Sequence, residues 1–533
     1  MNWSEKYCRP WFFLTVSAII GAAALCVYVF GSVHIYTDVA YCYAYAIREA
    51  AVYGNWSYVL DPGLPILNMG LGSLIALTGV EALRSFMLVG GLFWILSIFP
   101  LYSLLKRFVS PLAASLGCLV FILTPKIMRF SCSGLLESAR DFFFISALAL
   151  LFSLSDRKTW GRLVLFAIAL AGLALARAEG IVICAFFIVL LLADDLWLQR
   201  RSPTAKGFFR SLSFCAAAGV LFLILLSPKL IYNFQKTGYP TIDTRYNPYL
   251  DAFFRWNRFV ALPPDAMPAD SIANSANAYH STGKFTWGEN FSSVFSNMLR
   301  GGYEFYFGLA LIGVLICVCR PLQRVYERLR IPVPDLVKQG WRWEYTVFVV
   351  LTLIHCILYF ANCSAYRYYT FIVPMLLPAL LITLHLTVAA VKAAPRKYHL
   401  PAVLLAAGLL IAAAQIDNGL STAFTGSREW KIGCFLRDHA MLFRPDGRRV
   451  RVLNKHTRSC FFAGFDYANT SLNSKSKALT AREGDFDLAI FETDGEEAEM
   501  KALVEKYGLV PWDGHNPFPE DMIVFVPRRG TRR

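Results

Sequence analysis

Charged side chains are scarce in this chain of 533 residues. Asp, Glu, Lys and Arg make up only 17% of it, whereas 56% of the residues are hydrophobic and the mean hydropathy is +0.46. Soluble domains contain about 45–50% apolar residues, so the composition excludes a string of ordinary soluble domains. Apolar windows of about 17–22 residues recur, and helices of that length cross a hydrocarbon layer of about 30 Å. The sequence therefore predicts a polytopic membrane protein.

Several familiar motifs are also missing. The 13 cysteines form no CxxC pair and no spacing typical of a zinc site, so we interpret those in apolar windows as small packing residues. Cys434 and Cys460 lie in the polar tail, where they can pair only if that tail lies in an oxidising compartment. The sequence has no internal repeat and no Gly-rich phosphate-binding loop, which argues against the known nucleotide-binding motifs.

The formal net charge of +15 is not accompanied by a contiguous basic face, so it does not predict nucleic-acid binding. The basic residues instead cluster in five short loops between apolar windows, as is typical of cytoplasmic loops. These clusters are Lys106 and Arg107; Arg157, Lys158 and Arg162; Arg200, Arg201, Lys206 and Arg210; Arg320, Arg324, Arg328, Arg330, Lys338 and Arg342; and Lys392, Arg396 and Lys397.

The placement of the basic residues also predicts the topology. The short apolar segment 64–79 contains Pro65 and three glycines. If it crossed the membrane, Lys6 and Arg9 would lie opposite all five basic loops, so we expect it to be a surface or re-entrant segment. The expected spans, about 11 in number, are 11–32, 86–104, 110–125, 139–155, 162–177, 180–196, 211–229, 303–319, 344–362, 370–391 and 400–416.

This topology predicts an α-helical transmembrane domain over 1–416 and a small extracytoplasmic α/β domain over 417–533. The tail alternates the strand patterns "RRVRVL", "FDLAIF" and "MIVFVP" with the helical "EEAEMKALVEKYG". Other extracytoplasmic parts are a platform of juxtamembrane helices over 33–85, the turns 126–141, 176–180 and 362–369, and the long loop 230–302, expected to be irregular with short helices.

Four charged residues stand at the predicted extracytoplasmic ends of spans: Asp38, Glu137, Arg177 and Arg367. A charged side chain within the membrane is costly unless it takes part in a function or reaches the interface with water. The planar guanidinium of Arg binds phosphate with two hydrogen bonds. The pattern therefore suits a lipid-borne phosphate substrate that lies in the headgroup layer.

Structural interpretations of the same residues remain open at this stage. Asp38, beside Thr37, is also suited to cap a helix, and Arg367 can anchor an aromatic belt. The other structural roles are a salt bridge of Glu137 with Arg140 or Lys126, a pair of Arg177 with Glu179, an interfacial face made by Tyr41, Tyr43 and Tyr45, and packing roles for His34 and His355.

The order of these motifs resembles the GT-C superfamily of polyprenyl-phosphate-sugar glycosyltransferases, which includes protein O-mannosyltransferases and lipid A aminoarabinose transferases. Members show an acidic residue after the first span, a helix ending near "GDW" and a Pro-containing juxtamembrane helix. This chain has "YTDVAYCYAYAIREAAVYGNW" and then "DPGLPILNMGLGSLIALTG". The family's second acidic residue matches Glu137 in "SGLLESARD", its lysine-glycine turn matches "ARAEG", and its late Arg-Tyr matches "YRYYTFIVPMLLP". The resemblance covers about residues 10–400.

Two departures from the family pattern concern the donor site. Asp38 is followed by Val39, where the family often has a second acidic residue. The basic residue or histidine that commonly precedes the proline of the juxtamembrane helix is missing, and Asp61 and Pro62 stand nearby. Asp61 is a candidate for substrate contact, and so is Tyr41, by stacking of its ring on a sugar.

The resemblance implies a GT-C-like fold and transfer of a single sugar from a polyprenyl-phosphate donor to a glycolipid, polysaccharide or protein acceptor, with inversion. Asp38 would be the general base, Arg367 and Arg177 would bind the donor phosphate, and Glu137 would orient the loop or bind a divalent cation. The expected location is a bacterial inner membrane, among its lipids, with the site and the tail on the extracytoplasmic side.

Two other classes of function compete with this hypothesis. A multi-pass lipid or glycan transporter or flippase would usually show inverted repeats and broken helices at the midplane, and neither is visible in the sequence. A non-catalytic envelope assembly protein would not require the four charged residues to share one side of the membrane.

Overall fold

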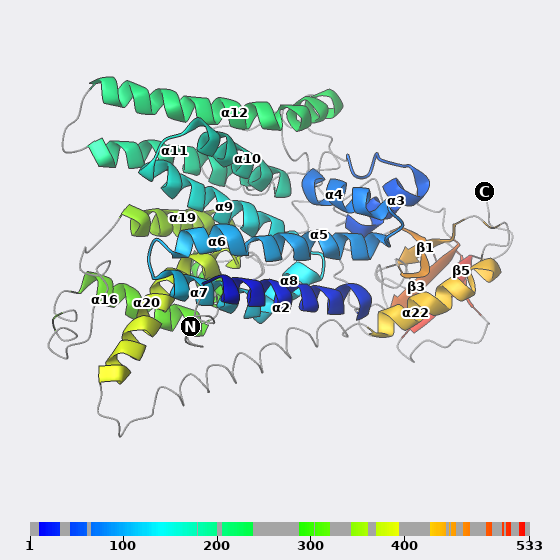
Figure 1. Cartoon of the computed structure of the whole chain (residues 1–533). Coiled ribbons are helices and arrows are strands. Elements are labelled where there is room, and N and C mark those ends of the chain that lie inside the picture. The colour runs from blue at the N-terminus through cyan, green and yellow to red at the C-terminus, as the bar shows by residue number, and fades with distance from the viewer. Residues whose placement is uncertain are drawn as a thin grey trace.

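The computed structural model describes a helical bundle followed by a small sheet (Figure 1). The described residues are 10–31, 43–60, 65–177, 180–199, 205–237, 287–302, 304–319, 324, 343–360, 369–393, 427–443, 447, 449–454, 462–468, 487–492, 501, 504–505, 508–512 and 522–527. The helices are α2 Pro10–Gly31, α3 Ala44–Tyr53, α4 Ile66–Ala76, α5 Ala82–Leu96, α6 Ile98–Leu105, α7 Pro111–Leu123, α8 Pro125–Cys132, α9 Glu137–Asp156, α10 Trp160–Ala176, α11 Gly180–Gln199, α12 Ala205–Thr237, α15 Trp287–Gly302, α16 Glu304–Val318, α19 Trp343–Phe360, α20 Ile372–Ala393, α22 Ser427–Asp438 and α23 Ala440–Phe443.

The predicted fold class, an α-helical membrane domain with a small α/β tail, is confirmed. Every predicted span except 400–416 coincides with a helix, and 400–416 lies outside the described residues. Within the described chain, four helices are long and apolar enough to cross a membrane when α5 and α6 are counted as one, and α7 with α8 makes a fifth if that bent pair is one span. Several shorter apolar helices accompany them, so the number of spans stays a prediction.

The segment 126–141 is not the simple turn that the sequence predicts. Pro125 begins the helix α8, which is bent by 60° from α7. A proline disfavours helical backbone angles in the residue that precedes it. Thr124, which precedes Pro125, is accordingly extended, with ψ 108°. Lys126 and Arg129 made this segment look like a polar turn, whereas α8 buries Ile127, Met128 and Phe130 among its neighbours. In the predicted loop 230–302, α12 continues to Thr237 and α15 occupies the last 16 residues.

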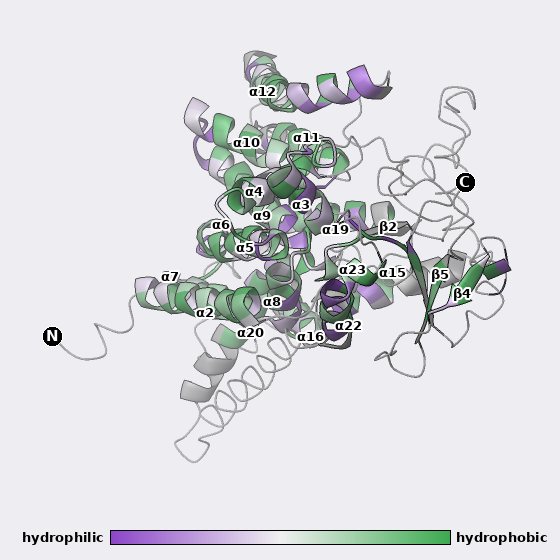
Figure 2. Cartoon of the chain, turned by 90° about the vertical axis from the view of Figure 1, so that its right-hand side faces the viewer, coloured by the Kyte–Doolittle hydropathy of each residue, from purple (hydrophilic) through white to green (hydrophobic). Residues whose placement is uncertain are grey.

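The bundle helices pack through aromatic side chains and through small residues that let backbones approach. Phe144 of α9 lies edge-on to Phe187 and Phe371, with ring centroids 5.6 and 5.7 Å apart. At Gly313 of α16 a Cβ atom would lie 2.1 Å from the Ala379 carbonyl oxygen of α20. Only glycine allows this approach, as is common between helices in lipid. Hydrophobic residues dominate the bundle (Figure 2).

The tail forms a five-stranded mixed sheet in the order β2-β1-β3-β5-β4. The strands are β1 Arg451–Asn454, β2 Asp466–Ala468, β3 Leu488–Glu492, β4 Leu509–Pro511 and β5 Met522–Pro527. β1 pairs in parallel with β2 and β3, whereas β5 runs antiparallel to β3 and β4. The three predicted strands correspond to β1, β3 and β5. Strands β2 and β4 have only three residues each, which is too short for an alternation of apolar and polar residues to be recognised in the sequence. Most of the predicted helix 496–508 and the domain boundary at 417 lie outside the described residues.

Two ends of the bundle can be distinguished. The continuous pair α5–α6 starts beside α3 and α4 and runs to Leu105, next to the basic loop that contains Arg107. The sheet lies at the α3 end (Figure 1). We call this the platform end, and the end that contains Arg107 the basic end.

Candidate active site

The helix α9 begins at Glu137 after a tight turn that follows α8. Gly134 in this turn has a φ of 77°, which glycine adopts without strain, and the Leu135 amide donates to the Phe130 carbonyl at 3.2 Å. The end of α8 before this turn packs closely against α5, where a Cβ on Gly90 would lie 2.4 Å from the Ser131 carbonyl oxygen. Glu137 therefore occupies the first turn of α9, where the helix dipole favours a carboxylate.

Glu137 and Arg177, two predicted site residues, form an ion pair. Arg177 Nη1 lies 3.1 Å from Glu137 Oε1, and the two side chains are only 13% and 3% exposed. Arg177 is thus a partner of Glu137 that the structural alternatives, Arg140 and Lys126, did not include. Lys126 donates to the Arg300 carbonyl oxygen. The structure brings together two residues that are 40 positions apart.

The end of α10 determines where Arg177 lies. Arg177 is the extended C-cap of α10, with φ −154° and ψ 139°, and its carbonyl accepts from the Gly180 amide at 2.9 Å. A Cβ on Gly180 would lie 2.4 Å from the Leu173 carbonyl oxygen. Glycine at this position lets α11 start directly beside the end of α10, and the turn directs Arg177 toward α9. Glu179, which the structural interpretation of the sequence paired with Arg177, lies outside the described residues.

A second buried network starts in the same turn of α9. Arg140 donates to Asp141 Oδ1 from Nε at 2.9 Å and from Nη2 at 2.7 Å. Nη2 also donates to Thr370 Oγ1 at 2.9 Å, and the Thr370 hydroxyl donates to Asp141 Oδ2 at 2.8 Å. We call Arg140, Asp141 and Thr370 the α9 clamp. Sequence reasoning missed it, because Thr370 is 229 residues from Asp141 and a threonine before a span carries no signal of its own.

The helix α3 follows the predicted catalytic residue Asp38 in the sequence and lies within the range 33–85, where juxtamembrane helices were expected. It ends at Tyr53, and Gly54 is a left-handed C-cap with a φ of 68° whose amide donates a hydrogen bond to the Glu49 carbonyl. Tyr43 packs against Phe86 of α5, with ring centroids 5.4 Å apart. The helix α4 has 11 residues, which is about 16 Å at 1.5 Å per residue. That length favours the prediction that 64–79 does not cross the membrane.

The α/β tail is held against α3 by two arginine contacts. Arg449 reaches Glu49 with both terminal nitrogens, at 2.6 and 3.3 Å, and its guanidinium lies 4.2 Å from the centroid of the Tyr53 ring. Arg48 donates to the Phe465 carbonyl at 3.3 Å. Glu49 is 4% exposed. The tail and the platform helix are therefore joined by a largely desolvated charge pair.

Asn68 is a further polar residue that sequence reasoning missed. It lies in the first turn of α4 and is only 1% exposed. Within the described residues, neither its amide nitrogen nor its amide oxygen has a hydrogen-bond partner. A buried amide without partners costs about 1–3 kcal/mol, so this position is suited to a polar group of a bound ligand.

The remaining predicted site residues are not placed by the structure. Asp38, Tyr41, Asp61 and Arg367 lie outside the described residues, as does His34. His355 is described, and it packs as expected: its ring stacks on Phe371 with centroids 3.6 Å apart, and Nδ1 contacts the Leu351 carbonyl at 2.7 Å.

A divalent cation has no built site in the described part of the chain. No group of three His, Cys, Asp or Glu side chains is placed there to hold a metal ion. The carboxylate of Glu137, the candidate ligand, accepts a hydrogen bond from Arg177. These residues do not fit a cation site, and we derive no step through a metal.

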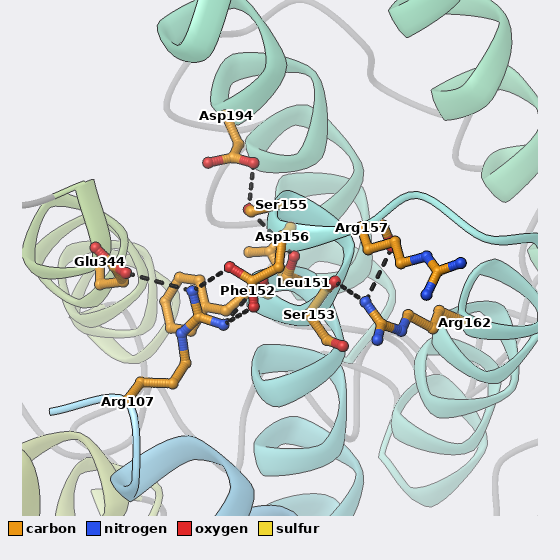
Figure 3. A network of polar contacts seen from close by, with 10 residues as sticks. All are labelled: Arg107, Leu151, Phe152, Ser153, Ser155, Asp156, Arg157, Arg162, Asp194 and Glu344. Carbon is orange, nitrogen blue, oxygen red and sulfur yellow. Dashed lines mark hydrogen bonds and ion pairs between the residues drawn. The ribbon is translucent and has the colours of Figure 1, made fainter. Parts of the chain in front are cut away.

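The basic end of the bundle carries a different polar network (Figure 3). Arg107 binds both carboxylate oxygens of Asp156, at the last residue of α9, and lies 3.6 Å from Glu344 of α19. Burial works against the charge on Arg107, but the hydrogen bonds and charges of Asp156 and Glu344 outweigh it and raise the pKa of the guanidinium. Arg162 donates to the Ser153 and Arg157 carbonyls. Two of the predicted cytoplasmic clusters thus meet at this end.

Comparison with known proteins gives matches only at the level of structure. No family model matches the sequence, and no curated protein matches it. ArnT from Cupriavidus metallidurans, solved bound to undecaprenyl phosphate, superposes with a TM-score of 0.56 at 13% identity, over 97% of this chain and 98% of that protein. An archaeal oligosaccharyltransferase, AglB from Archaeoglobus fulgidus, in complex with an inhibitory peptide and a dolichol-phosphate, has a TM-score of 0.50 at 14% identity, over 99% and 77%.

The Archaeoglobus fulgidus oligosaccharyltransferase was also solved with Zn and sulfate, and that structure has a TM-score of 0.53 at 13% identity, over 97% of this chain and 75% of that one. At such identities the likeness establishes the fold. ArnT and the oligosaccharyltransferase are both GT-C proteins, so the predicted GT-C-like fold is confirmed for this chain.

Proposed function

We propose that this chain is an integral membrane glycosyltransferase that moves a single sugar from a polyprenyl-phosphate donor to an extracytoplasmic acceptor, with inversion. The observation that carries the proposal is the buried Glu137–Arg177 pair at the start of α9, in a chain with the GT-C fold. ArnT, which shares this fold, was solved with undecaprenyl phosphate. The acceptor is a glycolipid, a polysaccharide or a protein.

Buried ion pairs are a poor means of gaining stability, which is why the position of this one supports a functional role. Removing a charge from water costs several kcal/mol even after relaxation. A cation that is kept at such a depth is by default a functional residue. Arg177 would bind the donor phosphate through its planar fork, and Glu137 orients the guanidinium from the first turn of α9.

The reaction requires a base for the acceptor and charge stabilisation for the leaving group. Asp38 removes the proton of the acceptor hydroxyl while its oxygen forms a bond to the anomeric carbon. The bond from the anomeric carbon to the phosphate oxygen breaks, and the electron pair leaves with the polyprenyl phosphate. Arg177 and Arg367 stabilise that anion where water is largely excluded. Asn68 would offer a donor and an acceptor to a sugar hydroxyl, and Asp61 and Tyr41 are further substrate contacts.

The purified full-length protein provides the test. We expect it to bind undecaprenyl phosphate at least 10-fold more tightly than undecaprenol, which lacks the phosphate, because arginines recognise the anion. In a panel of undecaprenyl-phosphate hexoses and pentoses, at least one should be consumed with release of undecaprenyl phosphate when envelope lipids and polysaccharide are supplied. Equal affinity for the two lipids together with no turnover of any donor would refute the proposal.

A further inference from the structure

The helix α4 begins without a side-chain cap. Its N-cap is Pro65, which makes no side-chain hydrogen bond to the first turn. The Met69 amide is the first to bond back along the helix, to the Pro65 carbonyl at 3.4 Å, so the amides of Ile66, Leu67 and Asn68 have no acceptor within α4. The helix has 11 residues, and the positive end of its dipole lies at these three donors.

Asn68 is the buried polar side chain of this first turn. It is the third residue after the N-cap, the position from which a side chain can turn back to bond the N-cap amide. Pro65 has no N–H, so that bond cannot form. Asn68 is 1% exposed, and neither Nδ2 nor Oδ1 has a hydrogen-bond partner within the described residues. The side chain therefore adds two N–H donors and one acceptor to the start of α4.

The face of α4 that carries Asn68 is turned toward the bundle. One turn later, a Cβ on Gly72 would lie 2.6 Å from Ile47 Cδ1 of α3 and 3.5 Å from Phe86 Cδ2 of α5, and residues four apart share one helix face. The helix α4 also packs against α10, whose C-cap at the platform end is Arg177. The start of α4 and the proposed phosphate-binding arginine thus belong to neighbouring helices at one end of the molecule.

A site with many N–H donors and a positive helix end distinguishes the groups that a sugar carries. A hydroxyl can accept from Nδ2 of Asn68 or from the open amides and can donate to Oδ1. A carboxylate accepts from the same donors and is favoured by the helix dipole. A protonated amine has no lone pair with which to accept, so it can use only Oδ1, and the dipole disfavours its charge.

We propose that the first turn of α4, with Asn68, is the sugar-binding subsite of the donor site and that it selects a sugar with a hydroxyl or carboxylate group over an amino sugar. This inference rests on the proposed function, because the sugar reaches α4 while its phosphate is held by Arg177. It assigns to Asn68 a role in choosing the donor. The affinity for the phosphate belongs to the arginine.

The test measures the affinity of the full-length protein for undecaprenyl-phosphate sugars. The parent sugar is the hexose or pentose with the lowest Kd, and its analogues carry an amine in place of one hydroxyl at a time. We expect at least one amino analogue to bind about 10-fold more weakly than the parent, because donors that a hydroxyl would satisfy are left unpaired. In Asn68→Leu most of this difference should disappear, with an unchanged Kd for undecaprenyl phosphate. Asn68→Ala removes the same amide if the leucine variant does not fold.

Ser73→Ala is the matched control. Ser73 is also buried in α4, but its hydroxyl donates to the Met69 carbonyl at 2.8 Å, so this variant should distinguish the sugars as the wild type does. Suppose that the wild type prefers undecaprenyl phosphate to undecaprenol but binds every amino analogue like the parent, or that removal of the Asn68 amide leaves the discrimination intact. The sugar-binding subsite is then wrong and the proposed function stands. Equal affinity for undecaprenyl phosphate and undecaprenol, without turnover of any donor, overturns both proposals.

Discussion

The two ends of α9 hold their charges in different ways. The helix has 20 residues, so the ends are about 30 Å apart, close to the thickness of the hydrocarbon layer. At the basic end Asp156 pairs with Arg107 while its side chain remains 59% exposed. At the platform end Glu137 is 3% exposed in its pair with Arg177, and Asp141 is 4% exposed in its pair with Arg140.

The proposed function gives this difference in exposure a reason. An exposed ion pair contributes about 0–1 kcal/mol and suits a loop whose charge only has to stay on one side of the membrane. A buried pair often contributes less than a hydrophobic replacement would, because both charges lose water. Two such pairs in one helix turn of α9 are therefore a poor source of stability, and our proposal that Arg177 binds the donor phosphate gives its pair a reason.

The first prediction asks whether the platform end is the catalytic end, and it has the largest expected effect. Asp38→Asn keeps the size of the side chain but cannot accept the proton, so turnover should fall about 100-fold or more. Donor binding and thermal stability should stay near wild type. Asn caps a helix about as well as Asp, so sugar transfer at the wild-type rate by this variant would identify Asp38 as a structural cap.

The second prediction compares one matched change at each end of α9. Glu137→Gln leaves the Arg177 charge buried without its carboxylate, and the free energy of unfolding should fall by about 3 kcal/mol. Asp156→Asn should lower it by less than about 1 kcal/mol, because Asp156 itself is 59% exposed and Glu344 remains beside Arg107. Denaturant titrations of both variants in the same detergent measure the two values. Equal losses would remove the distinction between the ends.

The third prediction concerns the kind of cation that is required at each end. Arg177→Lys retains the charge but loses the planar fork, so the donor KM should rise and kcat should fall, by roughly 10-fold in kcat/KM. Arg162→Lys, at the basic end, is the control, since Arg162 binds only backbone carbonyls in its described contacts. Steady-state kinetics of the two variants provide the measurement. Wild-type kinetics in Arg177→Lys would indicate that Arg177 merely reaches the interface.

The fourth prediction tests the link between the platform end and the tail, and its effect is the smallest. Glu49→Arg and Arg449→Glu should each loosen the α/β tail and raise its rate of cleavage in limited proteolysis. The double variant restores an opposite-charge pair, so we expect a coupling free energy of about 1 kcal/mol in a double-mutant cycle. Purely additive losses would mean that the pair does not hold the tail.

Much of this architecture could be predicted because a membrane imposes simple rules on a sequence. The long helices α2, α9 and α12 follow from apolar windows, and the gathering of Arg107 with Arg157 and Arg162 at one end follows from the distribution of basic residues. The helix α8 was not predicted because it has only eight residues, and its Lys and Arg make so short an amphipathic pattern difficult to recognise. Strands β2 and β4 were missed because each is held by its neighbours in the sheet and not by its own pattern.

The sequence by itself determined that the chain is a membrane protein, which apolar segments become helices, and that Glu137 and Arg177 share one end of the bundle. These properties depend on local composition and on whether the number of membrane crossings between two segments is odd or even. Only the tertiary structure decided that Glu137 binds Arg177, that Arg140 and Asp141 hold Thr370, and that Arg449 of the tail binds Glu49 of α3. Such pairs depend on how helix axes cross and on which turn faces which, and packing across hundreds of residues sets both.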